Sequence, residues 1–358
     1  MKATHILIYR YTVPFTEPLT VKGHRIVNRE GIILGLQTSE ECLTAYGEVA
    51  PLPGLHRETL ESAEEQLVEV LSKHQFANNS ILPDGLFPSV RTGLEMAMIN
   101  LEAVRSGRNP AYSDMTEGAA KHVPVNALLF GETEQVVHRA KEYSSLGYGT
   151  FKLKISAGNI DVAIRSIDAL HRMFGNSIEL RLDANQSLSL DEAIRFAGQI
   201  PIGSIAYIEE PLTKAELIGE FYAKTGIGSA LDETLWQKPE LLHQIPPAAI
   251  SALILKPNRL GGIAATLKLA RYAKKHHLLA VFSSAFESGI SLSFYSWLAA
   301  SATSKPAACG LDTYRYLKHD LLETPFVAEN GLLDVYKLYR KGLAVNKKHL
   351  KLISLWAI

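Results

Sequence analysis

The chain has 358 residues, of which 47% are apolar, and it carries 37 basic and 37 acidic side chains. This composition is typical of a soluble globular protein with more than one domain, and the balanced charge indicates neither a nucleic-acid partner nor an acidic membrane. Residues 1–9 lack the apolar core of a signal peptide, no apolar run is long enough to span a membrane, and two cysteines cannot form a disulfide framework. We therefore expect a cytoplasmic enzyme without a nucleic-acid or membrane partner.

Residues 1–115 predict an α+β capping domain. Alternating apolar and polar residues predict an antiparallel meander of strands over residues 5–13, 32–37 and 43–49, with a turn at residues 38–40. The polar stretch 14–30 predicts a long loop, and the proline-rich stretch 50–55 predicts a second one. Apolar stripes predict two helices that begin at Thr59 and Ser89 as N-caps, the first running to Gln75.

From residue 116 to residue 311 the pattern changes to alternating strands and helices. Strands are predicted over residues 122–129, 149–155, 178–184, 205–211, 228–233, 251–257, 279–285 and 307–311. Helices are predicted over residues 132–146, 262–277 and 288–302, and from near residues 161, 189, 215 and 239. Eight strands alternating with helices predict an α/β fold with a closed parallel barrel of the (β/α)8 type. Residues 312–358 are expected to return to the capping domain, with residues 332–338 as the returning strand.

Five of the predicted strands end in charged residues, at intervals of 23 to 29 residues. In chain order the charged residues are Lys152 with Lys154, Asp183, Glu209, Asp232 and Lys256. The carboxyl ends of parallel strands meet at one mouth of a barrel, where such folds hold their active sites. Three acids and three lysines at that mouth predict a metal site beside a general base.

The lysines Lys152 and Lys154 are two residues apart on one strand, so their side chains point the same way. Neighbouring ammonium groups and a nearby metal lower the proton affinity of a lysine, and a lysine then becomes a usable base near neutral pH. A pair of lysines alone is more often a solvated strand end. The acids at the neighbouring strand ends favour the functional interpretation.

The acids Asp183, Glu209 and Asp232 end three successive strands. Hard oxygen ligands from neighbouring strands suit Mg²⁺, which keeps positions open for substrate oxygens. Surface acids paired with arginine or lysine are the simpler alternative, which the regular placement disfavours. The alternation of side chains does not choose between Glu209 and Glu210, or between Asp232 and Glu233.

The lysine Lys256 ends the sixth strand, roughly across the barrel from Lys154. A cation there can stabilise negative charge, or act as a second base on the other face of a substrate. A salt bridge to Glu233 is the structural alternative, and both roles are compatible.

These residues resemble the motifs of the enolase superfamily, in its muconate-cycloisomerase-like branch. In that family's order stand Lys-x-Lys at 152–154, Asp-Ala-Asn at 183–185, Glu-Glu-Pro at 209–211, Asp-Glu at 232–233 and Lys-Pro at 256–257. The resemblance implies a modified (β/α)7β barrel with an N-terminal capping domain. It also implies Lys154 as the base and Asp183, Glu209 and Asp232 as ligands of a Mg²⁺ cofactor.

A closer resemblance is to the o-succinylbenzoate synthase family, in residues 47–59, 282–288 and 310–313. That resemblance implies that Ser283 and Gly310 hold a succinyl carboxylate and that Asn185 lies beside the metal. The segment 258–262 is instead more similar to racemase and epimerase members of the branch.

The resemblance implies a lyase acting on a small carboxylate substrate. It would dehydrate 2-succinyl-6-hydroxy-2,4-cyclohexadiene-1-carboxylate to 2-succinylbenzoate in menaquinone or phylloquinone synthesis, through an ene-diolate. Lys154 would take the proton and return it to the departing hydroxide, Lys152 would hold a carboxylate oxygen, and Lys256 would lie over the ring anion. The alternatives are an N-succinylamino acid racemase or dipeptide epimerase using Lys154 and Lys256, and a non-catalytic metal-binding barrel. The sequence Gly310-Leu-Asp312 disfavours the dipeptide epimerases, which usually carry Asp-x-Asp there.

Two loops of the capping domain, residues 17–29 and 50–58, are expected to close over the substrate, because an enolate must be protected from water. Within the first loop, Arg25 and Arg29 fit either a contact with a substrate carboxylate or an ordinary surface charge.

Overall fold

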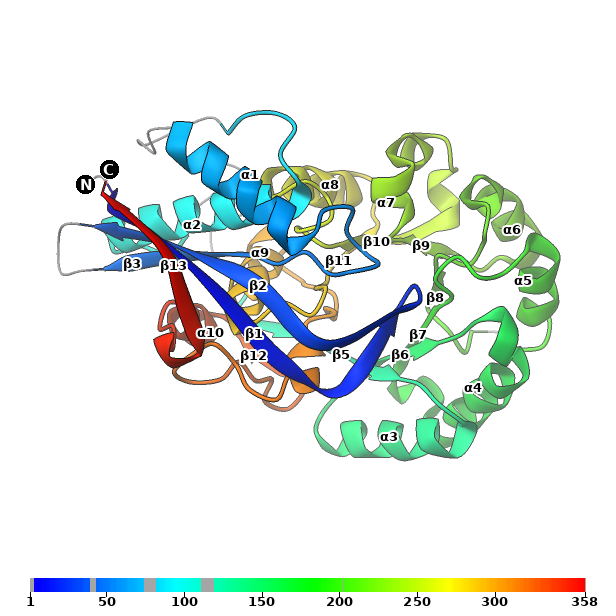
Figure 1. Cartoon of the computed structure of the whole chain (residues 1–358). Helices are drawn as coiled ribbons and strands as arrows, with labels where there is room; N and C mark the ends of the chain where they lie inside the picture. Colours follow the sequence, from blue (N-terminus) through cyan, green and yellow to red (C-terminus); the bar gives the residue numbers. More distant parts are fainter. Residues whose placement is uncertain (1–2, 39–42, 74–81, 111–118, 202, 358) are drawn as a thin grey trace.

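The computed structural model describes residues 3–38, 43–73, 82–110, 119–201 and 203–357 (Figure 1). Its strands are β1 Ala3–Val21, β2 His24–Thr38, β3 Thr44–Val49, β4 His122–Pro124, β5 Asn126–Leu129, β6 Thr150–Lys154, β7 Glu179–Asp183, β8 Tyr207–Glu209, β9 Ser229–Leu231, β10 Ile250–Leu255, β11 Leu279–Phe282, β12 Leu332–Asp334 and β13 Leu350–Ala357. Its α-helices are α1 Leu60–Lys73, α2 Pro88–Ser106, α3 Thr133–Ser145, α4 Ile160–Phe174, α5 Leu190–Ala197, α6 Ile218–Thr225, α7 Thr234–Gln237, α8 Ile263–Lys275, α9 Gly289–Ala302 and α10 Val335–Gly342. No helix in these ranges combines the length and apolarity of a membrane span.

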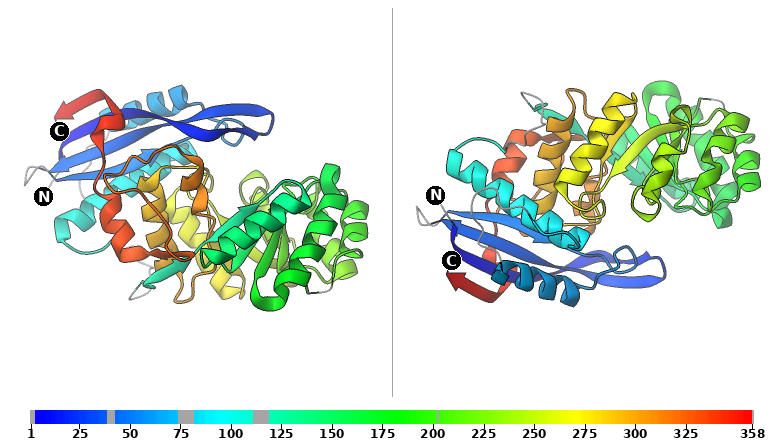
Figure 2. Two further views of the ribbon diagram at one scale, coloured as in Figure 1. Left: turned by 90° about the horizontal axis from the view of Figure 1, so that it is seen from below. Right: turned by 90° about the horizontal axis from the view of Figure 1, so that it is seen from above.

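The strands form an antiparallel sheet in the order β13-β1-β2-β3, a parallel sheet in the order β11 to β5, and a pair of β12 with β4. The antiparallel sheet covers one side of the barrel, and its β1–β2 hairpin reaches out over the barrel (Figure 2). One face of this sheet packs its isoleucines and leucines against α1 and α2, and the other face packs Tyr9, Tyr11 and Val13 toward the barrel. The predicted α/β barrel with an α+β capping domain is thereby confirmed.

The predicted loop over residues 14–30 is wrong, because β1 and β2 continue as a hairpin through this stretch. They turn at Lys22 and Gly23, which have φ of 45° and 83°, as a two-residue hairpin turn requires. Pairing extends to Val21 opposite His24, with a shift of register between Pro14 and Leu19. Most side chains here are exposed, so the stretch lacks the apolar alternation that marks a half-buried strand.

The strand predicted at residues 332–338 is not the one that returns to the capping sheet. Residues 332–334 pair with β4, and Asp334 then caps α10 by accepting from the amide of Lys337. The returning strand is β13, which pairs antiparallel with β1. The predicted domain boundary at residue 115, the turn at residues 39–40 and the helix end at residue 75 lie outside the described residues.

The barrel is closed between β11 and β5 by residues 309 and 310, within the predicted eighth strand. Asn126 N donates to Cys309 O at 3.0 Å, and Gly310 N donates to Phe282 O at 2.9 Å. Below the mouth the barrel interior is filled by Tyr207, Ala230, Ala252, Ile254 and Val281.

Two predicted helix starts differ from the structure. The helix expected from Pro239 is a 3-10 turn over Pro239–His243, and Pro246 and Pro247 follow it closely. The helix α2 begins at Pro88, and the hydroxyl of Ser89 donates to Glu58 at 2.7 Å instead of capping the helix.

The capping domain supplies carboxylates to the N-termini of two barrel helices. Glu95 of α2 accepts from the amides of Ile263 and Ala264 at the start of α8, at 2.5 and 3.1 Å. Glu48 of β3 accepts from the amides of Ser288 and Ser291 at the start of α9. Carboxylates favour helix N-termini because the free amides and the helix dipole there are positive. The two domains are thus joined just behind the loops that follow β10 and β11.

Candidate active site

The register of the parallel sheet brings the strand-end charges to one level. Lys154 lies opposite Asp183 across the β6–β7 pair, and Asp183 lies opposite Glu209 across the β7–β8 pair. Along β6 the side chains of Phe151 and Leu153 are buried between the sheet and the surrounding helices, so Lys152 and Lys154 take the alternate, inner face.

The structure separates the acids that the sequence left undecided. Glu209 shares the inner face of β8 with Tyr207 and lines the cavity, whereas Glu210 has a left-handed backbone with φ of 43° and points away. Ala230 belongs to the interior cluster, and Asp232, two residues later, pairs with Lys256.

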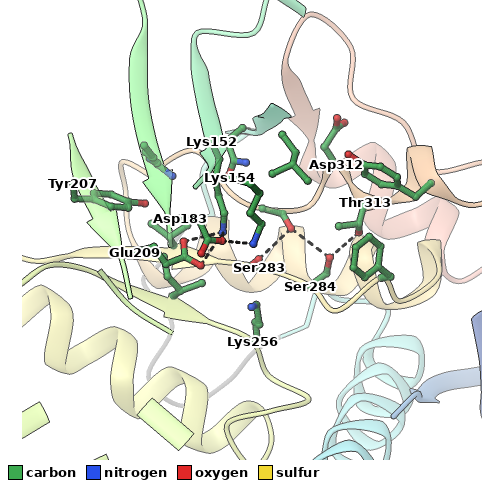
Figure 3. Close-up of a pocket in the computed structure, with 18 residues that line it drawn as sticks. Lys152, Lys154, Asp183, Tyr207, Glu209, Lys256, Ser283, Ser284, Asp312 and Thr313 are labelled. Carbon is green, nitrogen blue, oxygen red and sulfur yellow. Dashed lines mark hydrogen bonds and ion pairs between the residues drawn. The ribbon is translucent and has the colours of Figure 1, made fainter. Parts of the chain in front are cut away.

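Ammonium and carboxylate groups alternate across the site (Figure 3). Lys152 Nζ lies 2.8 Å from both oxygens of Glu209 and 2.8 Å from Asp183 Oδ2. Lys154 Nζ donates to Asp183 Oδ2 and to Asn185 Oδ1, both at 2.6 Å. Lys154 is the most accessible of the three lysines, with 37% of its side chain exposed against 15% for Lys152.

Burial and charge pairing act against one another on these groups. Burial opposes the charge on Lys152, but Asp183 and Glu209 outweigh it and raise the pKa of the ammonium well above its usual value. Burial and the nearby Asp183 raise the pKa of Glu209 to about 7. Within the chain itself, the two carboxylates therefore outweigh any effect of the neighbouring lysine on the proton affinity of Lys152.

The charged groups open into a cavity of about 140 Å³, with Lys152 and Lys154 on one side and Lys256 opposite (Figure 3). Its lining comprises Asn126, Leu128, Lys152, Lys154, Arg181, Asp183, Tyr207, Glu209, Ile254, Lys256, Val281, Ser283, Ser284, Phe286, Gly310, Asp312, Thr313 and Tyr316. Of the residues predicted from the sequence, Asn185 and Asp232 lie beside the cavity and contact Lys154 and Lys256.

The donor set can be compared with the needs of Mg²⁺. The carboxylates Asp183, Glu209 and Asp232 offer hard oxygens, the ligands that Mg²⁺ takes. The buried Oδ1 of Asp232 has no hydrogen-bond partner among the described residues. The lysines stand between these carboxylates. In the part of the chain that the structure describes, no three acidic, histidine or cysteine side chains are grouped as a closed metal site. The residue types fit Mg²⁺, and its binding requires the ammonium groups to move aside.

The part of the cavity wall that includes Ser283, Ser284 and Thr313 carries hydroxyl groups. Ser283 and Gly310 form a parallel bridge, and Ser283 Oγ donates to Gly310 O at 3.4 Å. A Cβ at position 310 would lie 2.5 Å from Ser283 Oγ, so only glycine fits without displacing the serine. Ser284 and Thr313 share a hydroxyl–hydroxyl hydrogen bond of 2.7 Å.

The sequence interpretation missed several lining residues. Arg181 and Tyr207 precede Asp183 and Glu209 by two residues, so strand alternation alone could have identified them. Asp312 and Tyr316 lie on a 3-10 turn after the barrel closes, where no periodic signal exists.

The arginine Arg29 takes neither of the two roles considered for it. Its side chain is 1% exposed and, within the described residues, donates to four backbone carbonyls. Those carbonyls belong to Glu30 in β2, to Ala50 and Pro51 in the second loop, and to Phe286 at the cavity. Arg29 thus joins the capping domain to the cavity wall.

Both capping segments contact the barrel mouth. Lys22, at the hairpin tip, lies 5.4 Å above the ring of Trp236, and Phe15 contacts the ring of Phe286 edge-on at 5.8 Å. In the second loop, His56 Nε2 lies 3.0 Å from Asn258 O. The hairpin and the second loop meet at Gly54, where a Cβ would lie 2.5 Å from the carbonyl of Val21.

Both parts of the chain match known protein families. Residues 135–348 match the family described as enolase C-terminal domain-like, and residues 3–101 match the MenC N-terminal domain.

Several curated proteins are similar over most of the chain. The o-succinylbenzoate synthase of Aliivibrio salmonicida is 31% identical, with 89% of this chain and 93% of that protein covered. The o-succinylbenzoate synthase of Haemophilus influenzae is 29% identical, with 88% and 91% covered. The chloroplastic protein PHYLLO of Arabidopsis thaliana is 32% identical over 82% of this chain, which spans 20% of PHYLLO's length.

Solved structures share the fold at lower identity. The N-succinyl Arg/Lys racemase of Bacillus cereus has a TM-score of 0.81 and 20% identity, with both chains fully covered. A dipeptide epimerase of Enterococcus faecalis, solved with Mg and a dipeptide, has a TM-score of 0.80 and 19% identity, with 98% of this chain and 100% of that chain covered.

Proposed function

Because the chain belongs to the o-succinylbenzoate synthase family of the enolase superfamily, we propose that it dehydrates 2-succinyl-6-hydroxy-2,4-cyclohexadiene-1-carboxylate to 2-succinylbenzoate. This reaction makes the chain a lyase of menaquinone or phylloquinone biosynthesis. The observation that carries the proposal is the cavity in which Lys152 and Lys154 face Lys256 beside Asp183 and Glu209.

The proposed ligands of Mg²⁺ are Asp183, Glu209 and Asp232. When bound, the ion would offset the negative charge that builds up on the substrate carboxylate as the adjacent carbon loses its proton. The all-oxygen donor set supports this assignment, as does the buried Oδ1 of Asp232, which has no hydrogen-bond partner within the described ranges.

Proton transfer is assigned to Lys154. Its neutral amine takes the proton from the carbon next to the ring carboxylate. The same ammonium then protonates the departing hydroxyl, so that the carbon–oxygen bond breaks and water leaves. Lys154 suits this role because its end group is accessible from the cavity and is held by Asp183 and Asn185.

The remaining charged and polar groups hold the substrate. Lys152 binds an oxygen of the ring carboxylate, and the ammonium of Lys256 faces the ring from the opposite side and stabilises its negative charge. Ser283 and Gly310 are proposed to hold the succinyl carboxylate at the hydroxyl-lined wall.

Racemisation of N-succinylamino acids is the second candidate. Lysines on opposite sides of the cavity can exchange protons with the two faces of one carbon, as a racemase requires (Figure 3). The sequence Gly310-Leu-Asp312 stands where dipeptide epimerases usually carry Asp-x-Asp, which favours N-succinyl substrates over dipeptides.

Assays of the purified chain with MgCl₂ distinguish the two functions. Turnover of the cyclohexadiene substrate with a far higher kcat/KM than any N-succinylamino acid is expected. Racemisation without dehydration would overturn the assignment as a lyase.

A further inference from the structure

Directly after Glu209, a second carboxylate lies behind the site. The side chain of Glu210 is fully buried and is not part of the cavity lining. Its Oε1 accepts from the amides of Asp232 and Thr234 at 2.8 and 2.7 Å. Its Oε2 accepts from Thr234 Oγ1 at 2.8 Å and from Gln186 Nε2 at 3.0 Å.

The four donors come from two other strand ends. Gln186 follows β7, and Asp232 and Thr234 follow β9, while Glu210 itself follows β8. One carboxylate therefore ties together the ends of three adjacent strands, those that carry the acids Asp183, Glu209 and Asp232.

The backbone around these contacts is strained. Asn185, Gln186 and Glu210 have φ of 44°, 61° and 43°, in the left-handed region that residues other than glycine seldom adopt. Such conformations persist only where the surroundings impose them, and they cluster at functional sites. The contacts of Glu210 span this strained region, together with the hydrogen bond that Asn185 Nδ2 donates to Glu233 Oε1 at 3.2 Å.

We propose that Glu210 is a positioning residue for the divalent-cation site, holding the main chain at Asp232 so that its carboxylate faces the other two acids. This inference rests on the proposed function. Through Gln186 the same carboxylate fixes the turn that presents Asn185 to Lys154.

The hydrogen-bond partners of Glu210 favour a carboxylate at this position. All four partners are placed as donors, and the two amides at Oε1 cannot reverse their direction. A glutamine has only one oxygen, so its NH₂ group would meet either those amides or the pair formed by Thr234 and Gln186. It would also remove the negative charge while keeping the shape of the side chain.

The test is Mg²⁺ affinity, measured by titration calorimetry with MgCl₂ and no substrate. Loss of a group that orients a metal ligand weakens metal binding by about 10- to 100-fold, and this loss is expected for Glu210→Gln. Turnover of the variant should recover as MgCl₂ is raised, because the proton-transferring lysine is intact.

A matched control separates positioning from stability. Glu95 is a partly buried carboxylate that also accepts from two backbone amides, at the start of α8. Glu95→Gln is expected to lower the Tm and leave the Mg²⁺ affinity unchanged. Wild-type affinity in a folded Glu210→Gln variant would overturn the positioning role.

A second variant keeps the test decisive if Glu210→Gln does not fold. Thr234→Val removes one donor to Glu210 and keeps the charge and the branched shape, so a smaller loss of Mg²⁺ affinity is expected. Wild-type affinity in Thr234→Val would then reject the proposal. If the wild-type chain itself bound no Mg²⁺, the proposed function would fail first, and the role of Glu210 with it.

Discussion

At the scale of single residues, the site is a set of buried charges that neutralise one another. Asp183 contacts two lysines, and Asp232 pairs with Lys256. Burial of an unpaired charge costs several kcal/mol, so removing one partner leaves the other strongly destabilised. Substitutions here must therefore keep either charge or shape, and each needs a check that the chain still folds.

Charge-preserving substitutions distinguish the roles of the two lysines that face each other across the cavity. Arginine keeps the positive charge but stays protonated, so it cannot act as a base. Lys154→Arg should lower kcat for dehydration by at least about 100-fold, the usual contribution of a general base. Lys256→Arg should retain measurable dehydration and lose any racemisation of N-succinylamino acids. Normal dehydration by Lys154→Arg, with none by Lys256→Arg, would reverse the two roles.

Removal of the Asp232 carboxylate tests the assignment of this residue as a metal ligand. Asp232→Asn keeps the shape and removes one anionic ligand, so Mg²⁺-dependent turnover should fall to background while the circular dichroism spectrum stays unchanged. Turnover in EDTA equal to that in MgCl₂ would contradict a metal role for this acid.

At the scale of elements, the β1–β2 hairpin and the second loop form one cover over the mouth. They touch each other at Gly54 and touch the barrel at Trp236 and Phe286. Since Phe286 also lines the cavity, we expect the cover to exclude water and to shape the substrate site.

Shortening the hairpin tests the cover. Removing Thr20, Val21, His24 and Arg25 deletes two cross-strand pairs and keeps the Lys22-Gly23 turn in register. We expect a lower kcat/KM with little change in Tm, because most of these side chains are exposed. An unchanged kcat/KM would show that the hairpin does not act as a cover.

Substitution of Glu95, which α2 places at the start of α8, provides a second test at this scale. Replacing a helix cap costs about 1 kcal/mol, and Glu95 is the side chain that meets the first amides of α8. Glu95→Ala should lower the free energy of unfolding by roughly that amount in chemical denaturation. A change confined to activity would instead place Glu95 in the active site.

At the scale of the whole molecule, the capping domain and the barrel are joined by polar contacts that are wholly or partly buried. Arg29 binds carbonyls of both parts, and His56 links the second loop to Asn258 behind Lys256. The amide of Leu52 donates to His56 Nδ1, so Nε2 carries the proton and donates to the carbonyl of Asn258.

The lowered pKa of His56 predicts that the stability of the folded chain depends on pH. Burial, and then the neighbouring Arg259 and Arg29, lower the pKa of His56 to about 3. An unfolded histidine titrates near about 6.5, so between these values the unfolded chain binds the extra proton. The stabilisation from His56 is therefore complete above about pH 6.5 and declines as the pH falls toward 3. The Tm difference between the wild type and His56→Gln should shrink from pH 7.5 to pH 5, and a growing difference would contradict this sign.

The sequence by itself determined the order of the barrel strands and helices, and the charges that follow five of those strands. These features are local, because alternation, helix periodicity and strand ends are written in short stretches. The motifs Lys152–Lys154, Glu209–Pro211 and Lys256–Pro257 also sufficed to identify the enolase superfamily, which the family comparison confirms.

Only the tertiary structure decided how these stretches meet. The long hairpin, the return of β13 to β1, and the closure at residues 309 and 310 depend on pairing between segments far apart in the chain. The same is true of the site: register placed Glu209 in the cavity, and Glu210 behind it against Asp232. Hydrogen-bond register and the burial of polar groups are properties of the packed chain, so no local pattern could have shown that the side chains of Arg29 and Glu210 hydrogen-bond to the backbone.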